Sequence, residues 1–269
     1  MTPAQPTSQK PFRRWFQYSL RTLMILVTLF ALACSWFAVK LGQARRQREA
    51  VEGIRKLGGS VTYDYECDSS NRIIKGAKAP GPAWLRNLLG IDCFCNVTQV
   101  WGRGKVSDAE LVYLKCFPQL RIFFFQDAQI TNDGLEIIQG LTQVQVLGLQ
   151  GSKITDAGMQ HFENMTQLKE LYLQDNNITD DGLKYLQGLI QLQDLHLSDT
   201  QVTDDGLKHL KGLTNLIFLD LSNSYVSNAG LVHLKGLKKL ETLDLSKTNV
   251  TDAGVQDLQK TLPNLKIER

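Results

Sequence analysis

The sequence has few of the residues that build disulfide scaffolds and metal centres. Its 269 residues include five cysteines and four histidines. An odd, loosely spaced set of cysteines is not a disulfide framework. The tripeptide Cys93-Phe94-Cys95 lacks the two-residue gap and the second ligand pair of a zinc knuckle. We therefore expect the cysteines to be small hydrophobic side chains, with Cys93 and Cys95 on one face of a strand.

The sequence also lacks the groupings on which enzymes and ion-binding sites depend. No Ser/His/Asp or Cys/His set has a meeting point, and no loop has the ligand spacing of an EF-hand. Three histidines recur at one position of a sequence repeat: His161, His209 and His233. Asp220 and Asp244 are expected on adjacent strands, but an open sheet offers them no water-excluding pocket. The sequence thus predicts a non-enzyme with no catalytic residue, metal, cofactor or small-molecule substrate.

The net charge of +3 conceals two different parts. Residues 1–60 are strongly basic, with only Glu49 and Glu52 as acids, whereas acids outnumber bases after position 60. This asymmetry indicates different surroundings for the two parts. The lysines of the later part have almost no aromatic residues between them, which argues against a nucleic acid partner. They are Lys184, Lys208, Lys211, Lys235, Lys238 and Lys239.

The only long hydrophobic run lies near the N-terminus. Residues 23–39 carry no charge and would span about 25 Å as a helix, close to the ~30 Å of a bilayer core. Arg21 and Lys40 can extend their charges to the interface, and Trp15, Tyr18 and Trp36 stand near the ends of the run, where such rings favour the interface. We predict a basic tail over 1–16 and a single transmembrane helix over 17–41.

A cleaved signal peptide is the alternative, and Ala31-Leu32-Ala33-Cys34 weakly resembles a lipoprotein cleavage site. The apolar run continues beyond Cys34 to Val39, which favours an uncleaved signal-anchor. Basic residues flank both ends of the run in nearly equal number, so the positive-inside rule hardly favours either orientation in the membrane. We predict a single-pass protein of the cell membrane with its later part exported.

Residues 42–58 continue as a juxtamembrane helix. Ala50, Val51, Ile54 and Leu57 form one apolar stripe at helical spacing, and Gly58-Gly59 ends the helix. A cap region over 59–105 follows. In it Val61, Tyr63 and Tyr65 alternate as in a short strand, and 84–89 follow Pro82 as a short helix.

From position 106 onward the sequence repeats about every 24 residues, a period typical of stacked repeat units. Each unit reads L-x-x-L-x-L-x-x-[TNS]-x-[IV]-T-D-x-G-L-x-x-L-x-x-L. Leu171 and Leu173 alternate, which predicts a strand with Tyr172 facing out, and Leu183 with Leu186 predicts a short helix. One unit cannot bury enough apolar surface to offset the entropy of ordering it, so the units must stack.

Polar residues also repeat. A Thr or Ser stands at the expected N-cap of each helix, with an Asp or Asn in the first turn. A glycine follows, and we expect it to allow close backbone packing. The caps are Thr179, Thr203, Ser227 and Thr251; the next residues are Asp180, Asp204, Asn228 and Asp252; the glycines are Gly182, Gly206, Gly230 and Gly254.

The six-fold period resembles the leucine-rich repeat family over about 106–267. Together with the N-terminal stretch RRWFQYSLRTLMILVTLFA, the chain is similar to bacterial, planctomycete-type membrane-anchored members. The resemblance implies an α/β solenoid over 106–269, with a parallel sheet on a concave face and short helices on the convex face. It also implies that one polar column bonds to backbone at the turns: Asn176, Thr200, Ser224 and Thr248.

The side chains that alternate outward on the strands predict a docking surface. Acids surround aromatic rings there, which fits a protein partner with a basic segment, and solenoids commonly bind on their concave face. The predicted partner-binding residues are Glu170, Tyr172, Asp175, Asp194, His196, Asp199, Phe218, Asp220 and Asp244. The alternative interpretations are a solvated sheet face and a structural, self-assembling component of the cell envelope.

Overall fold

The structure is a computed structural model that describes residues 20–104 and 106–269. The chain divides into two compact units, Met1–Gly42 and Gln43–Arg269. The predicted basic tail over 1–16, together with Trp15 and Tyr18, lies outside the described residues.

Helix α1, Leu20–Lys56, is one uninterrupted α-helix and includes the apolar run. Among the described residues, α1 is the one helix long and apolar enough to cross a membrane. No side chain of its apolar stretch is buried. This is compatible with a single-pass anchor or with a signal sequence.

The last turns of α1 are part of the second unit. Ala50, Val51 and Ile54 are buried there, as the predicted stripe requires, whereas Leu57 is half-buried beyond the end of the helix. Among the described residues, the buried hydrophobic cluster runs from Ala50 to Leu265. This cluster therefore lies within the second unit.

A buried carboxylate ties α1 to the cap region. Asp92 Oδ1 accepts hydrogen bonds from Gln47 Nε2 and Tyr63 Oη, both at 3.1 Å, and Arg48 Nε lies 3.5 Å from Asp92 Oδ2. Gln47 Nε2 also donates to the carbonyl of Cys95 at 2.8 Å. Burial, and then Asp92, raise the pKa of the Tyr63 phenol.

Two expectations for the cap region are wrong. Tyr65 is not on the strand, because β1 ends at Tyr63 and a 3₁₀ turn, Asp64–Glu66, follows. Cys93 and Cys95 do not share a strand face: Cys93 ends the 3₁₀ turn Ile91–Cys93, and Cys95 is buried before the next strand begins. Both remain free thiols, and burial raises the pKa of Cys95 to about 12. The short helix expected over 84–89 is α2, Ala83–Leu89.

Nine strands form one sheet in which neighbours in sequence are neighbours in space. β1 pairs with β2 in antiparallel orientation, and all later pairs are parallel. The strands are β1 (Ser60–Tyr63), β2 (Val97–Arg103), β3 (Ile122–Gln126), β4 (Val146–Gly148), β5 (Glu170–Tyr172), β6 (Asp194–His196), β7 (Phe218–Asp220), β8 (Thr242–Asp244) and β9 (Lys266–Glu268). The parallel sheet thus begins at β2, before residue 106.

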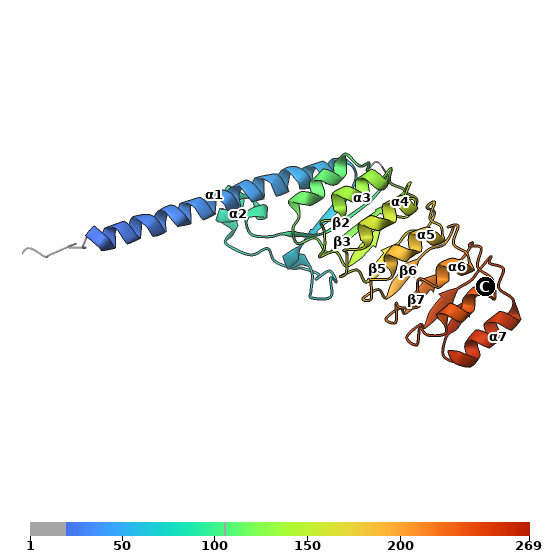
Figure 1. The fold of residues 1–269 in the computed structure, drawn as a ribbon. Helices are drawn as coiled ribbons and strands as arrows, with labels where there is room; N and C mark the ends of the chain where they lie inside the picture. The colour runs from blue at the N-terminus through green and yellow to red at the C-terminus, as the bar shows by residue number, and fades with distance from the viewer. Residues whose placement is uncertain (1–19, 105) are drawn as a thin grey trace, which may run out of the picture. The chain divides into compact units, whose positions relative to one another are not determined.

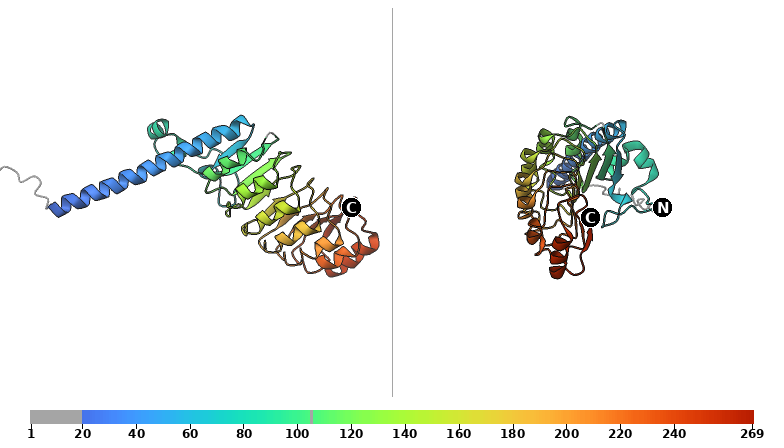
Figure 2. Two further views of the ribbon diagram at one scale, coloured as in Figure 1. Left: turned by 45° about the horizontal axis from the view of Figure 1, so that its top comes forward. Right: turned by 90° about the vertical axis from the view of Figure 1, so that its right-hand side faces the viewer.

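Short helices return the chain from each strand to the next. They are α3 (Asn132–Ile138), α4 (Asp156–Met159), α5 (Asp180–Leu183), α6 (Asp204–Leu207) and α7 (Asp252–Thr261), with 3₁₀ turns at Glu110–Cys116, Gln160–Phe162, Lys184–Leu186 and Gly230–Leu234. The helices lie along one side of the solenoid, and the strands of the sheet lie along the other side (Figure 1). Successive turns follow one another in chain order (Figure 2). The predicted solenoid is confirmed.

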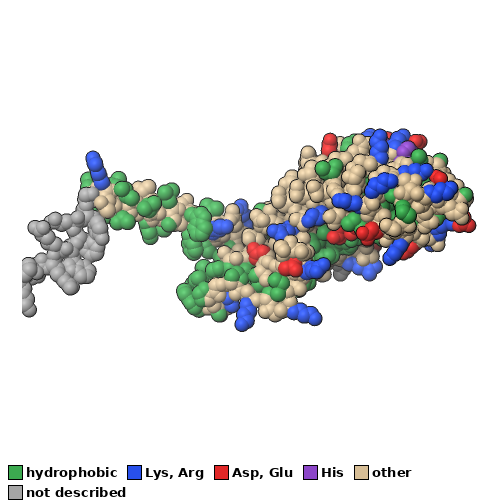
Figure 3. Space-filling view, turned by 90° about the horizontal axis from the view of Figure 1, so that it is seen from below, with side chains coloured by type: hydrophobic (Ala, Val, Ile, Leu, Met, Phe, Trp, Pro, Cys, Tyr) green, Lys and Arg blue, Asp and Glu red, His purple; other side chains and the backbone are tan. Residues whose placement is uncertain are grey.

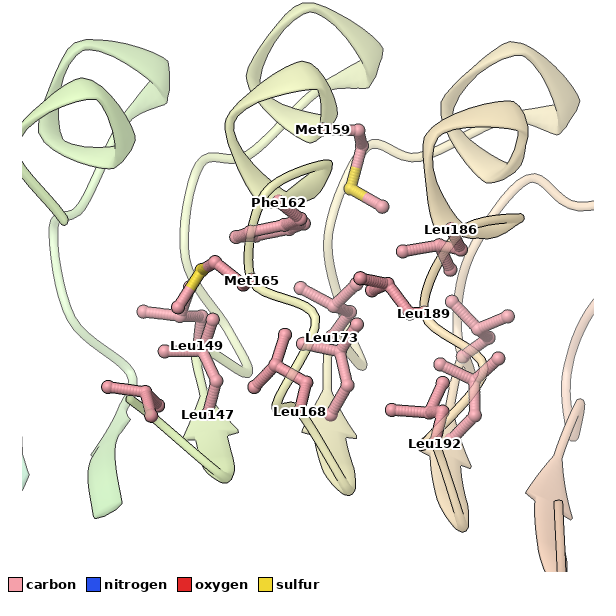
Figure 4. Packing of buried hydrophobic residues seen from close by; sticks show 14 of the residues in the cluster. Leu147, Leu149, Met159, Phe162, Met165, Leu168, Leu173, Leu186, Leu189 and Leu192 are labelled. Atoms are coloured by element: carbon pink, nitrogen blue, oxygen red, sulfur yellow. The ribbon is translucent and has the colours of Figure 1, made fainter. Parts of the chain in front are cut away.

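The core lies between the helices and the strands. Side chains from each turn interdigitate with those of the next, as Met159, Phe162 and Leu186 do below the helices in Figure 4. All three are fully buried. Each turn therefore completes the core of its neighbour, which is the physical reason for the repetition.

A polar ladder joins successive turns on the helix side. Asp180 Oδ1 accepts from the Thr203 backbone N–H at 2.8 Å, and Asp180 Oδ2 accepts from Thr203 Oγ1 at 2.6 Å. The same two bonds join Asp108 to Thr131, Asp156 to Thr179, and Asp204 to Ser227. The first-turn acid expected to favour its own helix thus also binds the cap of the next.

Asparagine changes the direction of one bond in this ladder. Asn132 accepts from the Thr155 N–H at 3.0 Å, but its Nδ2 donates to Thr155 Oγ1 at 2.8 Å. Asn228 binds Thr251 in the same way. A hydroxyl has one hydrogen to donate. The four hydroxyls that donate to an aspartate also accept a bond from the backbone N–H two residues later. Thr155 and Thr251 make no such cap bond.

The predicted N-cap positions hold at Thr179, Thr203 and Thr251. Ser227 is an exception, because its turn is a 3₁₀ helix that begins at Gly230 after Ala229. Its hydroxyl nevertheless accepts from the Ala229 N–H at 3.3 Å.

The repeated glycines leave room for the ladder. A Cβ on Gly206 would lie 2.3 Å from Asp180 Oδ1 and 3.1 Å from Leu183 Cδ1. The close approach is thus to a side chain of the preceding turn, and the backbone packing expected from the sequence is not the main reason for glycine here.

Candidate functional site

A row of aromatic rings crosses the sheet on the face opposite the helices. Trp101 stacks on Phe124 with ring centroids 5.3 Å apart, and Phe124 meets the edge of Tyr172 at 5.1 Å. Tyr172 stacks on His196 at 4.3 Å, and His196 lies 4.7 Å from Phe218. The row therefore runs without interruption from β2 to β7. We call it the aromatic row.

Strand register sets this arrangement. Tyr172, His196 and Asp220 stand at paired positions of β5, β6 and β7, and Glu170, Asp194 and Phe218 occupy the paired positions two residues earlier. Parallel strands in register place such residues beside one another on one face. The predicted columns of outward-facing residues are confirmed.

A glycine allows the aromatic row to continue across β4. Gly148 of β4 lies between Phe124 and Tyr172 in the register. A Cβ on Gly148 would be 2.3 Å from Phe124 Cδ2. Because glycine has no side chain, Phe124 covers it and reaches the ring of Tyr172 two strands away.

Four half-buried carboxylates adjoin the aromatic row: Glu170, Asp194, Asp220 and Asp244. Glu170 Oε2 accepts from the Tyr172 hydroxyl at 3.0 Å. Burial, and then the nearby charge of Glu170, raise the pKa of Asp194 above its usual value. Figure 3, seen from below, shows acidic side chains close together on this part of the surface.

Asp220 behaves differently from Asp194. Burial alone would raise its pKa, but His196 and hydrogen bonds from Ser222 lower it on balance. The Ser222 hydroxyl donates at 2.7 Å and its backbone N–H at 2.9 Å, while His196 Nδ1 lies 3.9 Å from Asp220 Oδ2. Asp244 Oδ1 accepts from the Ser246 N–H at 2.8 Å in the same manner. These two carboxylates are held in place by the turns that follow their strands.

Two of the predicted binding residues, Asp175 and Asp199, are not on the strands themselves. They lie three residues beyond β5 and β6, exposed, with left-handed backbone φ angles of 54° and 55°. Asn223 and Lys247 have the same conformation one and two turns further on. The four line a polar groove of about 490 Å³ formed by the turns that follow β5 to β8. Asp, Asn and Gly tolerate this conformation best, which explains their repetition there.

Sequence reasoning missed Trp101, and with it the beginning of the aromatic row. Trp101 pairs with Phe124, and Phe124 pairs with Gly148, so the first step along the chain is one residue shorter than the second. A search at a fixed period therefore overlooks Trp101. The β-branched and aromatic residues between Val97 and Trp101 are the signal that could have found this strand.

The polar column behind the strands bonds to backbone, as expected. Asn176 Nδ2 donates to the Leu149 carbonyl of the preceding turn at 2.9 Å, and its Oδ1 accepts from the Ile154 N–H at 3.1 Å. Thr200, Ser224 and Thr248 instead donate to the carbonyl three residues earlier in their own turns. Only the asparagine links two turns in this column of the described structure.

Comparisons with known proteins agree with this architecture. Residues 142–202 and 236–258 match two models described as leucine rich repeat. The crystal structure of internalin C2 from Listeria monocytogenes is 30% identical in sequence with a TM-score of 0.50, over 65% of this chain and 70% of that one. The chain belongs to the leucine-rich repeat family. No curated protein matches it.

Two more distant structures are also similar. An internalin (inlF) from Listeria monocytogenes is 22% identical, with a TM-score of 0.38 over 59% of this chain and 56% of that one. A leucine-rich repeat protein from Leptospira interrogans is 16% identical, with a TM-score of 0.42 over 59% and 51%.

Leucine-rich repeat domains are generally protein-interaction modules and are typically not enzymes. Among residues 20–104 and 106–269, no three His, Cys, Asp or Glu side chains are grouped so that they could hold a metal ion. The aromatic row and its carboxylates form an open surface suited to recognition of another molecule.

Proposed function

We propose that this protein is a membrane-anchored interaction module that binds a basic segment of a partner protein across the aromatic row. The observation that carries the proposal is the unbroken series of rings from Trp101 to Phe218, with carboxylates beside it. Aromatic side chains dominate the binding energy of many protein interfaces. The planar rings and the acids together favour arginine or lysine, which can stack on a ring and pair with a carboxylate.

The charges of the surface support a cationic partner. Asp194 lies beside Glu170, and the like charge contributes to its raised pKa. Among the described residues, the only ion pair of these four carboxylates is that of Asp220 with His196, at 3.9 Å. A partner's guanidinium or ammonium group would relieve the repulsion. The acids therefore favour binding at some expense of stability.

The membrane part of the proposal rests on α1. Its apolar stretch is exposed along its length in the structure, and the run continues past the candidate cleavage site at Cys34. We propose a single-pass anchor in the cell membrane with the repeat unit exported. The division into tail (1–16), spanning helix (17–41), juxtamembrane helix (42–58), cap (59–105) and solenoid (106–269) is part of this proposal. Protease accessibility of the repeat unit in intact cells tests the orientation.

The binding surface is tested with the fragment 43–269 immobilised as bait for a displayed random-peptide library. We expect enriched peptides to contain arginine or lysine. Tyr172→Ala and Phe218→Ala should each weaken their binding about 10- to 30-fold, the effect of losing one strong aromatic contact. Asp194→Asn should weaken it with little change in shape.

Matched controls separate the surfaces. Ile190→Ala with Val232→Ala removes exposed apolar side chains away from the aromatic row and should not change peptide affinity. Asp175→Asn tests the polar groove alone and should also leave it unchanged. Enrichment of acidic or charge-free peptides would contradict the proposal. Concentration-dependent self-assembly that survives the Tyr172 and Phe218 variants would favour the structural envelope role instead.

A further inference from the structure

The cap region contains a second apolar surface, distant in sequence from the transmembrane run. On α2, Trp84 is 67% exposed and Leu88 is 72% exposed. Residues four apart lie on the same face of a helix, so the two side chains form one unpartnered apolar face. In the loop before α2, Ile73 is 70% exposed as well. Large apolar side chains with this exposure, gathered in so short a segment, indicate a contact surface.

The charge of this segment has one sign only. Residues 69–91 contain Arg72, Lys75, Lys78 and Arg86 and no acidic residue. Arg86 donates to the carbonyls of Ala79 and Pro80 and so holds the loop. The other three are exposed and take part in none of the ion pairs found among the described residues. Three free cations thus accompany the apolar face.

A hydrogen bond and a short stretch of chain connect the segment to the end of the apolar run. Arg48 donates from Nη2 to the carbonyl of Leu89, the last residue of α2, at 2.8 Å, and α2 lies beside this part of α1 in Figure 1. Arg48 follows Leu41 by only seven residues. Even a fully extended chain of that length spans no more than about 25 Å. If α1 is anchored in a bilayer, this short tether keeps Arg48, and the end of α2 that it binds, close to the bilayer surface.

From these observations we infer that residues 72–88 form a second membrane contact, in which Trp84 and Leu88 enter the interface of an anionic bilayer. Arg72, Lys75 and Lys78 pair with anionic lipid headgroups. Tryptophan favours the interface, and a single short apolar contact becomes effective when it is combined with basic residues or with a tether. The inference rests on the proposed membrane anchor for its biological setting, but lipid binding can be measured without the anchor.

The test uses the fragment 43–269, which contains the buried hydrophobic cluster found among the described residues, in a Trp101→Phe background so that Trp84 is its single tryptophan. The fragment is mixed with vesicles of phosphatidylcholine alone or with phosphatidylglycerol added. We expect flotation with the anionic vesicles, a blue shift of Trp84 emission, and quenching by brominated lipid chains. A cooperative thermal transition confirms that the fragment is folded.

Two variants divide the contributions. Because Trp84 reports the contact, flotation alone is measured for Trp84→Ala with Leu88→Ala, and it should show at least tenfold weaker binding. Lys75→Glu with Lys78→Glu should weaken binding to anionic vesicles at least tenfold. The matched control for charge is Lys211→Glu with Lys238→Glu, because these lysines are also exposed but lie in turns of the repeats, distant in sequence from α2.

The outcomes separate this inference from the anchor. No flotation and no emission shift on anionic vesicles would overturn it, as would an emission shift produced by fragment concentration in the absence of lipid, which would make the face a protein interface. Alkaline extraction of the full chain from membranes tests the anchor by itself. If the full chain resists extraction but the fragment does not bind vesicles, the anchor is supported and only the second contact is refuted. A floating fragment would support it whatever the extraction shows.

Discussion

Replacing Asp180 tests whether the polar ladder stabilises the stack of turns. Asp180→Ala removes two acceptors, for the Thr203 N–H at 2.8 Å and for its hydroxyl at 2.6 Å. A hydrogen bond to a charged group contributes about 1.5–3 kcal/mol, and Thr203 is only half-buried, so water can replace part of the loss. We expect the free energy of unfolding to fall by about 2–4 kcal/mol. Denaturant unfolding of the fragment 43–269, followed by circular dichroism, measures it.

The chain itself provides the control for this substitution. Asn228 occupies the equivalent ladder position and keeps the bond to the backbone N–H of Thr251 while reversing the bond to its hydroxyl. Asp180→Asn should therefore lose little more than the 3.3 Å cap bond from Asp205 N–H to Thr203 Oγ1, or about 0.5–1.5 kcal/mol. Equal losses in the Ala and Asn variants, within about 0.5 kcal/mol of each other, would refute the ladder as a source of stability.

Two further predictions concern the glycines and the acidic surface. Gly206→Ala places a Cβ 2.3 Å from Asp180 Oδ1 and should lower the free energy of unfolding by about 1–3 kcal/mol. Gly212→Ala, with open space around it, should lower it by no more than about 0.5 kcal/mol. Denaturant unfolding compares the two variants, and equal losses would contradict the steric explanation. Asp194→Asn should stabilise the fragment at neutral pH by at most about 1 kcal/mol, because the side chain is half-exposed. The folded pKa of Asp194 lies above its ordinary value of 3.8, so wild type and variant should be equally stable below that pH. The free energy of unfolding of wild type should then fall below that of the variant as the pH rises through the raised pKa. A variant that is more stable than wild type only at acid pH would contradict this reasoning.

The sequence predicted the stacking of turns because the repeat is a local and periodic signal. The spacing of Leu171, Leu173 and Leu183 predicts which side chains of one turn face the core. The regular period predicts the register of the next turn. Tyr172 and His196 are therefore placed on one face by counting alone. Free cysteines and an apolar N-terminal helix also follow from local composition.

Irregular segments were less predictable. Tyr65 continues an alternating pattern, yet the chain turns at Asp64, whose backbone N–H donates to the Asn96 carbonyl at 2.9 Å. The strand that carries Trp101 departs from the period by one residue, which hides it from a periodic search. In both places the deciding contact is with a segment distant in sequence, Asn96 for Asp64 and Phe124 for Trp101. No local pattern reports such a contact.

The sequence by itself determined the solenoid, the facing of its side chains and the existence of an apolar N-terminal helix, because each follows from spacing along the chain. Only the tertiary structure decided what neighbouring turns do to one another. It joined five rings across a glycine into one row, bonded Asp180 to the cap of the next turn, and gave Asp175 and Asp199 a left-handed backbone beyond the strand ends. These are relations between side chains on different turns, and their distances and directions depend on packing that the spacing of residues does not specify.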